Sequence, residues 1–234
     1  MQLRWDTQGA RRFQTGVDRG VLYLKGNNGF NDAYPWNGLV NVTDSPSGAE
    51  PTPLYADDIK YLNLMSMEDF GYTIEAYTFP DAFAKCDGSY EVGEGVYAHQ
   101  QERVPFGFSY RTMIGDETGA YIGYILHLIY NGTATVAERS YASLSDSMDP
   151  GTMSWEISTI PAEIPGFLPS AWVEINSLKA NPRKLKAVED ILYGTYNEDA
   201  RLPMPDEVIE LFYDHAIYPS ATLYPAATVF PQDI

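Results

Sequence analysis

Apolar and polar residues alternate in short stretches along most of the chain, and Gly, Pro and Asn separate these stretches. Alternation with a period of two is typical of strands that bury one face. In one stretch, Tyr72, Ile74, Ala76 and Thr78 share a face, whereas Thr73, Glu75, Tyr77 and Phe79 share the other. Because the second face also carries aromatic side chains, we expect it to meet another subunit. The predicted strands are residues 17–24, 59–66, 71–79, 106–114, 121–130, 133–141, 152–160 and 171–176.

Turn residues indicate how these strands are connected and favour a mainly β fold. Residues 89–103 are rich in Gly and Glu and are predicted to form a loop. The spacing of strands and turns predicts a β-sandwich or barrel, as a single domain over residues 1–234. The predicted hairpins join 59–66 to 71–79 and 106–114 to 121–130.

Helix signals are concentrated near the C-terminal end of the chain. Asn181 is suited to cap a helix and Pro182 to occupy its first position, and an apolar stripe follows. These residues predict one flanking α-helix near 182–193. Two acidic residues after a Pro favour a shorter C-terminal helix over 205–213, since negative charge stabilises a helix N-terminus. A Pro-started helical turn is also expected at 80–85.

Residues 26–56 are rich in Gly, Asn, Pro and Ser and show no clear alternation. We interpret them as a long assembly loop, which is either disordered or an arm that orders on a neighbouring subunit. Trp36, Leu39 and Leu54 would give this arm apolar side chains to bury in contacts between subunits. The C-terminal extension at 215–234 contains three Pro and is expected to be extended at best.

The charge is large, negative and unevenly distributed. The formal net charge is −17, so tight binding to DNA or RNA is not expected, although repulsion of DNA is compatible with it. The N-terminal arm, residues 1–16, is basic and includes Arg4, Arg11 and Arg12. A basic arm on an acidic body would attract another copy head to tail, which makes these arginines candidate inter-subunit contacts. Ion pairs within one subunit are the alternative.

No sequence pattern indicates catalysis, a cofactor or a metal. His99, His127 and His215 lie far apart and show no metal-ligand spacing, and His127 is interpreted as a structural histidine in a strand. Adjacent carboxylates such as Asp57 and Asp58 are interpreted as solvated surface charge rather than a glycosidase pair. A Ser-His-Asp site assembled by the fold stays an alternative, but we expect no enzyme.

Cysteine content and hydropathy bear on the compartment. Cys86 is the single cysteine, so no internal disulfide forms, and a small buried thiol is expected. No apolar run approaches the ~20 residues of a membrane-spanning helix. The first residues lack the apolar region of a signal peptide, so we expect folding in a cytoplasm and no membrane insertion.

Several motifs, in this order, resemble the major tail proteins, or tail tube proteins, of long-tailed, siphovirus-like bacteriophages. The resemblance extends from about residue 9 to about residue 214 and is weaker in 90–102 and in the last twenty residues. Each motif alone has little specificity, and the order and coverage carry the match. The motifs are residues 15–22, 36–39, 44–57, 106–112, 154–156, 185–194 and 201–208.

The resemblance implies a structural protein of the virion tail, assembled in the bacterial host cytoplasm. Members form hexameric rings that stack into a tube for DNA delivery, with sheets joined around the ring and loops and arms bound to the next ring. Expected partners are further copies, a tape-measure protein, a tail terminator and baseplate or distal tail proteins, with transient passage of DNA. An acidic lumen would repel DNA, and Asp57, Asp58 and Glu75 are candidate lumen-lining residues.

Two other functions are compatible with the sequence. The first is the inner tube protein of a contractile injection machine or tail-like particle. The second, from a different class, is a β-sandwich that binds or hydrolyses carbohydrate on aromatic platforms such as Trp36, Trp155 or Trp172.

Overall fold

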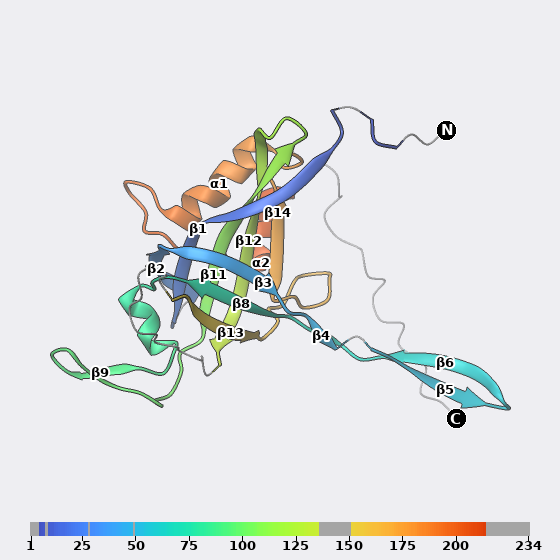
Figure 1. Cartoon of the computed structure of the whole chain (residues 1–234), viewed down its shortest axis with the longest axis horizontal. Helices are drawn as coiled ribbons and strands as arrows, with labels where there is room; N and C mark the ends of the chain where they lie inside the picture. The colour runs from blue at the N-terminus through green and yellow to red at the C-terminus, as the bar shows by residue number, and fades with distance from the viewer. Residues whose placement is uncertain (1–4, 8, 28, 49, 136–150, 214–234) are drawn as a thin grey trace, which may run out of the picture.

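The protein is mainly β, with one eight-stranded sheet, three small two-stranded sheets and two α-helices in the part described (Figure 1). The structure is a computed structural model and describes residues 5–7, 9–27, 29–48, 50–135 and 151–213. The strands are β1 (Arg12–Gly26), β2 (Gly29–Trp36), β3 (Leu39–Asp44), β4 (Ser47–Gly48), β5 (Pro51–Ala56), β6 (Ile59–Met65), β7 (Glu68–Asp69), β8 (Gly71–Ala76), β9 (Tyr90–Gly93), β10 (Val96–Ala98), β11 (Phe106–Asp116), β12 (Tyr121–Ala134), β13 (Met153–Thr159) and β14 (Trp172–Asn176). The helical elements are the 3-10 helix η1 (Asp81–Lys85) and the helices α1 (Pro182–Tyr193) and α2 (Pro205–Phe212).

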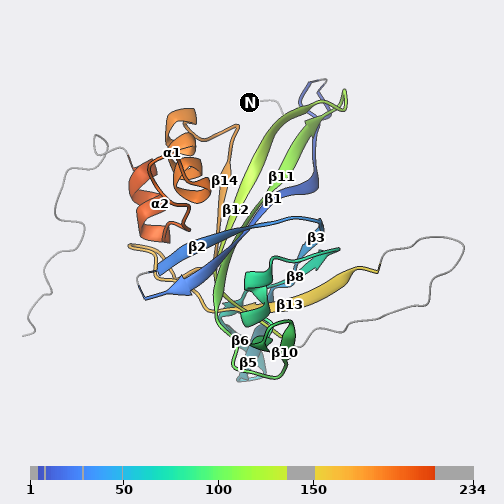
Figure 2. The same ribbon diagram turned by 90° about the vertical axis from the view of Figure 1, so that its left-hand side faces the viewer.

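The long strand β12 divides the large sheet, because it pairs with different strands along its length. Its residues 125–129 pair with β14, and its residues 132–134 pair with β13. From β13 the sheet continues through β8 to β3, and on the other side of β12 it continues through β11 and β1 to β2. In Figure 2, β14 runs beside the helices, whereas β13, β8 and β3 lie on the other side of β12. We call β3, β8 and β13 the wing.

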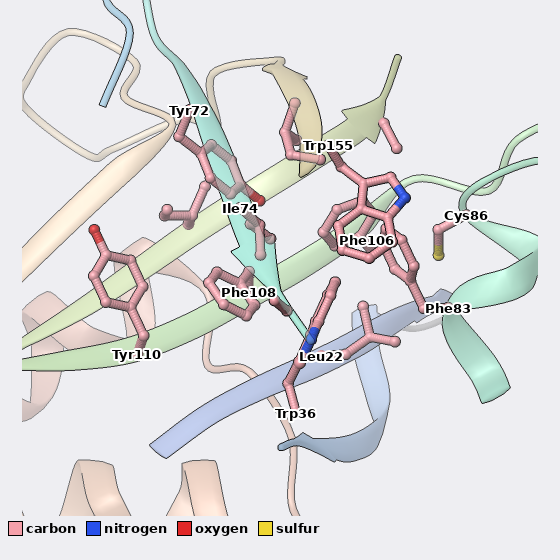
Figure 3. Close-up of a cluster of buried hydrophobic side chains, with 14 residues drawn as sticks. Leu22, Trp36, Tyr72, Ile74, Phe83, Cys86, Phe106, Phe108, Tyr110 and Trp155 are labelled. Carbon is pink, nitrogen blue, oxygen red and sulfur yellow. The ribbon is translucent and has the colours of Figure 1, made fainter. Parts of the chain in front are cut away.

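The first core fills the space between the wing and strands β1 and β11 (Figure 3). Trp155 is completely buried, and its ring centroid lies 5.3 Å from that of Phe83 and 5.8 Å from that of Trp36. Both pairs have edge-to-face geometry, which is favourable for aromatic rings. The inward face of β8, with Tyr72 and Ile74, reaches the same core, as the alternation of that strand predicted.

The second core lies between the sheet and the two helices. Helix α1 begins where Asn181 accepts a hydrogen bond from the backbone N–H of Arg183 at 3.0 Å, and it buries Leu185, Val188 and Leu192. The buried hydroxyl of Tyr23 on β1 donates to the carbonyl of Leu192 at 2.9 Å. This bond ties the end of α1 to strand β1 of the large sheet.

The segment 26–56, predicted as a long irregular loop, is largely β-strand. β2 pairs with β1, β3 pairs with β8, and β5 pairs with β6. The prediction that this segment is irregular is wrong, because its pairing partners are distant strands that its local composition does not reveal. Leu39 packs where Gly20 has no side chain, which allows β3 to lie close to β1.

The predicted hairpin of 59–66 with 71–79 is also wrong. β6 pairs with β5, and β8 pairs with β13 and β3. The predicted loop at 89–103 contains the small β9–β10 hairpin. In the N-terminal arm, residues 12–16 belong to β1, where they continue the pairing with β11.

Other predicted elements are confirmed. β11 and β12 form the expected hairpin, α1 has the predicted bounds, and α2 and η1 agree closely with their predictions. Of the predicted strand at 133–141, residues 133–134 end β12, and 136–141 lie outside the described residues. The C-terminal extension at 215–234 with His215 also lies outside them, as does Arg4.

Candidate assembly surface

The β5–β6 hairpin projects from the body on the short β4–β7 pair (Figure 1). The hairpin and the β4–β7 pair lie between β3 and β8 in sequence, and we call β4, β7 and the residues that join them to β3 and β8 the root of the hairpin. Strands β3 and β8, which flank this root, belong to the wing. Every residue of β5 and β6 is exposed. A two-stranded hairpin with no packed face has little stability of its own in water.

The tip of this hairpin is a two-residue turn formed by Asp57 and Asp58. Their φ angles are 51° and 62°, so both residues are left-handed, as a type I′ turn requires. This turn twists in the sense that matches the two strands, and Asp tolerates the left-handed region better than most side chains. The predicted lumen residues Asp57 and Asp58 therefore lie at the end of a projection.

Large apolar side chains cover the hairpin and its root. Tyr61 is 69% exposed, Met65 is 70% exposed, and Leu64 is 54% exposed. A group of exposed large apolar side chains on one element is typical of a site that binds a partner. The complete set of exposed large apolar residues here is Leu54, Tyr55, Ile59, Tyr61, Leu62, Leu64, Met65 and Met67.

The outer face of the wing has the opposite character. Glu75 lies on β8 opposite Ser154 of β13, and Glu156 of β13 lies opposite Thr73 of β8. Directly opposed residues share a face, so the two glutamates stand on one polar surface. Glu75 therefore lies on a separate surface from Asp57 and Asp58, because β6 and β8 do not pair. Glu156 was not singled out from the sequence as a candidate lumen residue, although it lies in the predicted strand at 152–160.

The predicted inter-subunit residues lie in different environments. Arg11, Arg12 and Leu54 are exposed. Trp36 is only 3% exposed, packs in the first core and donates its indole N–H to the carbonyl of Thr78 at 2.9 Å. This placement corrects the expectation that Trp36 contacts a neighbour, because its side chain completes the core of its own subunit. Leu39 also packs against that core.

The carbohydrate alternative loses its aromatic platforms for the same reason. Trp36 and Trp155 are buried, and Trp172 is partly buried between the rings of Phe70 and His127. A sugar-binding platform needs an exposed aromatic face, which neither Trp36 nor Trp155 provides.

The candidate chemical groups serve the fold. His127 is buried, as expected of a structural histidine, and burial lowers its pKa to about 4. Cys86 is buried as predicted, and burial raises the pKa of its thiol to about 12. His99 Nδ1 lies 2.7 Å from the Ser89 hydroxyl, a contact that joins the two ends of the β9–β10 hairpin. The absence of enzymatic activity stays a prediction.

Within the described ranges, no cluster of three or more His, Cys, Asp or Glu side chains is arranged to hold a metal ion. No helix among the described residues is long and apolar enough to span a membrane.

Comparisons with solved structures give matches of low similarity. Hcp1 from Flavobacterium johnsoniae is 11% identical with a TM-score of 0.29, over 61% of this chain and 90% of that chain. A chain of the sheath–tube complex of PVC, an extracellular contractile injection system, is 12% identical with a TM-score of 0.32, over 68% and 88%. A chain of the anti-feeding prophage baseplate is 7% identical with a TM-score of 0.36, over 75% and 97%. No protein-family model matches the sequence, and a search of the curated proteins finds no match. Similarity this low does not establish a family.

Proposed function

We propose that this chain is a structural subunit that assembles as stacked hexameric rings into the tail tube of a long-tailed bacteriophage. The observation that carries the proposal is the β5–β6 hairpin, whose apolar side chains are exposed on both faces. Burial of a large apolar side chain contributes about 1.5–3 kcal/mol. Docking this hairpin on a neighbouring copy would therefore stabilise both the hairpin and the contact.

The geometry of such a contact favours a polymer. We propose that the hairpin docks on a different surface of the next copy, so that the contact is heterologous and repeats without closing along the tube axis. The exposed Arg11 and Arg12 on an acidic chain add attraction between copies. The exposed hairpin and the basic residues support the stacking of subunits. The resemblance of the ordered sequence motifs to tail tube proteins supports the hexameric ring.

We also propose a location and partners for the chain. We propose that it acts in the virion tail after assembly in the host cytoplasm, with a tape-measure protein, a tail terminator and baseplate or distal tail proteins. DNA passes through the tube without tight binding, since like charges repel. The chain is proposed to have neither an enzymatic nor a membrane-inserted role.

The alternative within this class is the inner tube of a contractile injection or tail-like particle. The exposed hairpin suits that role equally, because both kinds of tube stack subunits. Binding of a contractile sheath protein to purified tubes would favour the alternative, whereas bare tubes in infectious particles would favour the phage tail.

The test is negative-stain electron microscopy of purified protein over a range of concentrations. We expect rings or hollow tubes of uniform width from the wild type. A variant with residues 50–66 replaced by Asn-Gly should stay folded but unassembled, because none of the described residues it lacks is buried. A deletion of residues 27–50 would be a poorer test, because it removes β2, β3 and β4, and β2 and β3 belong to the large sheet.

Two outcomes would contradict the proposal. Tubes formed by the 50–66 variant would show that the hairpin is not the assembly element. Wild-type protein that stays monomeric at its highest soluble concentration, even when mixed with tail initiator complexes, would argue against a tube subunit.

A further inference from the structure

Strand β14 has one paired edge and one open edge in the described part of the chain, where its only partner is β12. The N–H of Tyr130 donates to the carbonyl of Ala171 at 2.9 Å. The N–H of Ser177 donates to the carbonyl of Tyr124 at 3.0 Å. Because the backbone groups of successive strand residues point to opposite sides, the odd-numbered residues of β14 face β12 and the even-numbered residues face the open edge.

Local bonds close the two ends of this edge and leave its middle open. The hydroxyl of Ser170 donates to the carbonyl of Trp172 at 2.8 Å and accepts from its N–H at 3.2 Å. The carbonyl of Asn176 accepts from the N–H of Ala180 at 2.9 Å. Between them, the N–H and carbonyl of Glu174 point outward and have no partner among the described residues. An open strand edge is a template for a further strand.

An apolar groove of about 390 Å³ lies beside this edge, between β14 and α2. Its apolar lining comes from Val173 and Ile175 of β14 and from Val208, Ile209 and Phe212 of α2. Val173 and Ile175 lie on the face of β14 that packs against the second core. Ile209 and Phe212 are only half-buried. A strand added at the open edge would bury apolar side chains here if they shared the face of Val173 and Ile175.

The sequence after α2 contains three copies of a six-residue pattern, over residues 217–234, which lie outside the described part. The copies are Ile-Tyr-Pro-Ser-Ala-Thr at 217–222, Leu-Tyr-Pro-Ala-Ala-Thr at 223–228 and Val-Phe-Pro-Gln-Asp-Ile at 229–234. Each copy begins with an aliphatic residue, an aromatic residue and a Pro, in that order. Repetition of one short pattern indicates that each copy is suited to the same kind of binding site.

The even period of this repeat gives corresponding residues the same parity. Pro219, Pro225 and Pro231 are all odd-numbered, and every odd-numbered residue from 217 to 231 is Ile, Leu, Val, Ala or Pro. In a strand, these residues would share one apolar face. The nitrogen atoms of the three Pro would also point to the same side. A strand that turns this side away from its partner loses no hydrogen bond to it, although Pro has no N–H.

The open edge of β14 matches such a strand in antiparallel pairing. Directly opposed residues then share a face, and pairs that exchange two hydrogen bonds alternate with pairs that exchange none. Even-numbered residues of the repeat would exchange hydrogen bonds with Glu174, so the odd-numbered residues would stand opposite Val173 and Ile175 and enter the groove. At about 3.4 Å per residue, one repeat spans about 20 Å and the five residues of β14 span about 17 Å. One repeat therefore fits one β14.

The chain connection favours the first repeat of the same subunit. Helix α2 ends at Phe212, which lines the groove, and the first repeat begins at Ile217. The connecting residues can extend over about 17 Å, which is enough to reach along the groove. A segment on so short a tether has an effective concentration on the order of millimolar. It therefore outcompetes the same segment of a second copy in dilute solution.

We propose that residues 217–222 bind the open edge of β14 in their own subunit as an added antiparallel strand, with Ile217, Pro219 and Ala221 in the groove beside α2. The segment closes a sheet edge and an apolar groove that would otherwise be accessible to other chains. The second and third repeats present the same pattern and can replace the first. This contact goes beyond the proposed function and does not depend on tube formation.

Hydrogen exchange of single backbone amides tests the proposal, followed by nuclear magnetic resonance in the full chain at low concentration. The N–H of Glu174 faces the open edge, so it should exchange slowly when the segment is bound there. The N–H of Ile175 faces β12 and should exchange slowly in every variant, which makes it the internal control for an intact sheet.

Two variants of identical composition separate the position of Pro from its presence. The first moves each Pro by one residue, to an even-numbered position where it would face β14 without an N–H, so protection of Glu174 should be lost. It combines Pro219→Ser with Ser220→Pro, Pro225→Ala with Ala226→Pro, and Pro231→Gln with Gln232→Pro. The second moves each Pro by two residues and keeps its parity, so protection should stay at the wild-type level. It combines Pro219→Ala with Ala221→Pro, Pro225→Ala with Ala227→Pro, and Pro231→Asp with Asp233→Pro.

Each outcome either supports the contact or overturns it. Slow exchange at Glu174 in the wild type and the second variant, with fast exchange in the first, supports it. Fast exchange at Glu174 in the wild type, or equal protection in the two variants, would overturn it. Protection that disappears on dilution would show that a second copy supplies the strand, which would overturn the assignment to the same subunit. All of these results come from unassembled protein, so they are independent of the assembly test.

Discussion

Strands β3 and β8 of the wing belong to the same continuous stretch of chain as the β5–β6 hairpin, yet the wing and the hairpin use apolar residues in opposite ways. β8 of the wing buries Tyr72, Ile74 and Ala76 and presents polar residues outward. The hairpin, inserted between β3 and β8, exposes Leu and Tyr side chains on both faces. The wing is stabilised by the core of its own subunit, and the hairpin lacks such a core. The difference is the reason for our proposal that another copy of the chain covers the hairpin.

The largest expected effect comes from a substitution that destabilises the wing and leaves the hairpin unchanged. Trp155→Ala removes a completely buried indole that contacts Phe83 and Trp36, so we expect a loss of about 3–5 kcal/mol in the free energy of unfolding. The matched variant Leu64→Ala on the exposed hairpin should change it by less than about 0.5 kcal/mol.

Urea unfolding of the monomeric protein measures both variants. In an assembly assay the two variants should differ in the opposite sense. Leu64→Ala should reduce tube formation although its free energy of unfolding is unchanged. Equal losses of unfolding free energy in the two variants would show that the hairpin packs against its own subunit.

The next largest effect tests the contrast between the apolar surface of the hairpin and the polar outer surface of the wing. Reversing Glu75 and Glu156 to Lys changes the charge of the outer wing face, which we propose as a lumen-lining surface. Tubes should form normally, because no exposed apolar contact is altered, but attraction of the new cations to DNA should slow its delivery.

DNA ejection rates from particles that carry this variant measure the effect. A matched pair of reversals on exposed residues of another face, Glu198→Lys and Asp199→Lys, is the control. Ejection at the wild-type rate from intact tubes would remove Glu75 and Glu156 from the lumen.

Local signals in the sequence predicted several elements well. The bounds of α1 follow from Asn181 and Pro182 at its start and an apolar stripe along it, all of which act within a few residues. The β11–β12 hairpin follows from alternation around one turn. The inward face of β8 was also predicted from alternation, and the structure confirms it.

Strand partners could not be predicted in the same way. β2 and β3 lie in a Gly- and Pro-rich segment, and they become strands because β1 and β8 offer them backbone hydrogen bonds. β6 and β8 are neighbours in sequence, but β8 pairs with the distant β13. For the same reason the site was only partly predicted: Leu54 is exposed, Trp36 is in the core, and Glu75 lies on β8, which pairs with β13 and β3 rather than with the hairpin strands.

The smallest expected effect concerns the hairpin turn itself. Asp58 has a φ of 62°, in the left-handed region where a Gly is free of the strain that a side chain experiences. Asp58→Gly relieves about 1–2 kcal/mol of strain but adds about 0.5–1 kcal/mol of unfolded-chain entropy. The net stabilisation of the hairpin is thus about 0.5 kcal/mol, or roughly a twofold change in the ratio of its folded to its unfolded form. Nuclear magnetic resonance of the monomer, through cross-strand contacts between Leu54 and Leu62, measures that population. Asp58→Asn is the control, because it removes the charge and keeps the side chain. If Asn produced the same gain as Gly, charge at the tip rather than backbone conformation would limit the hairpin, and the wing would differ from it in electrostatics as well as in burial.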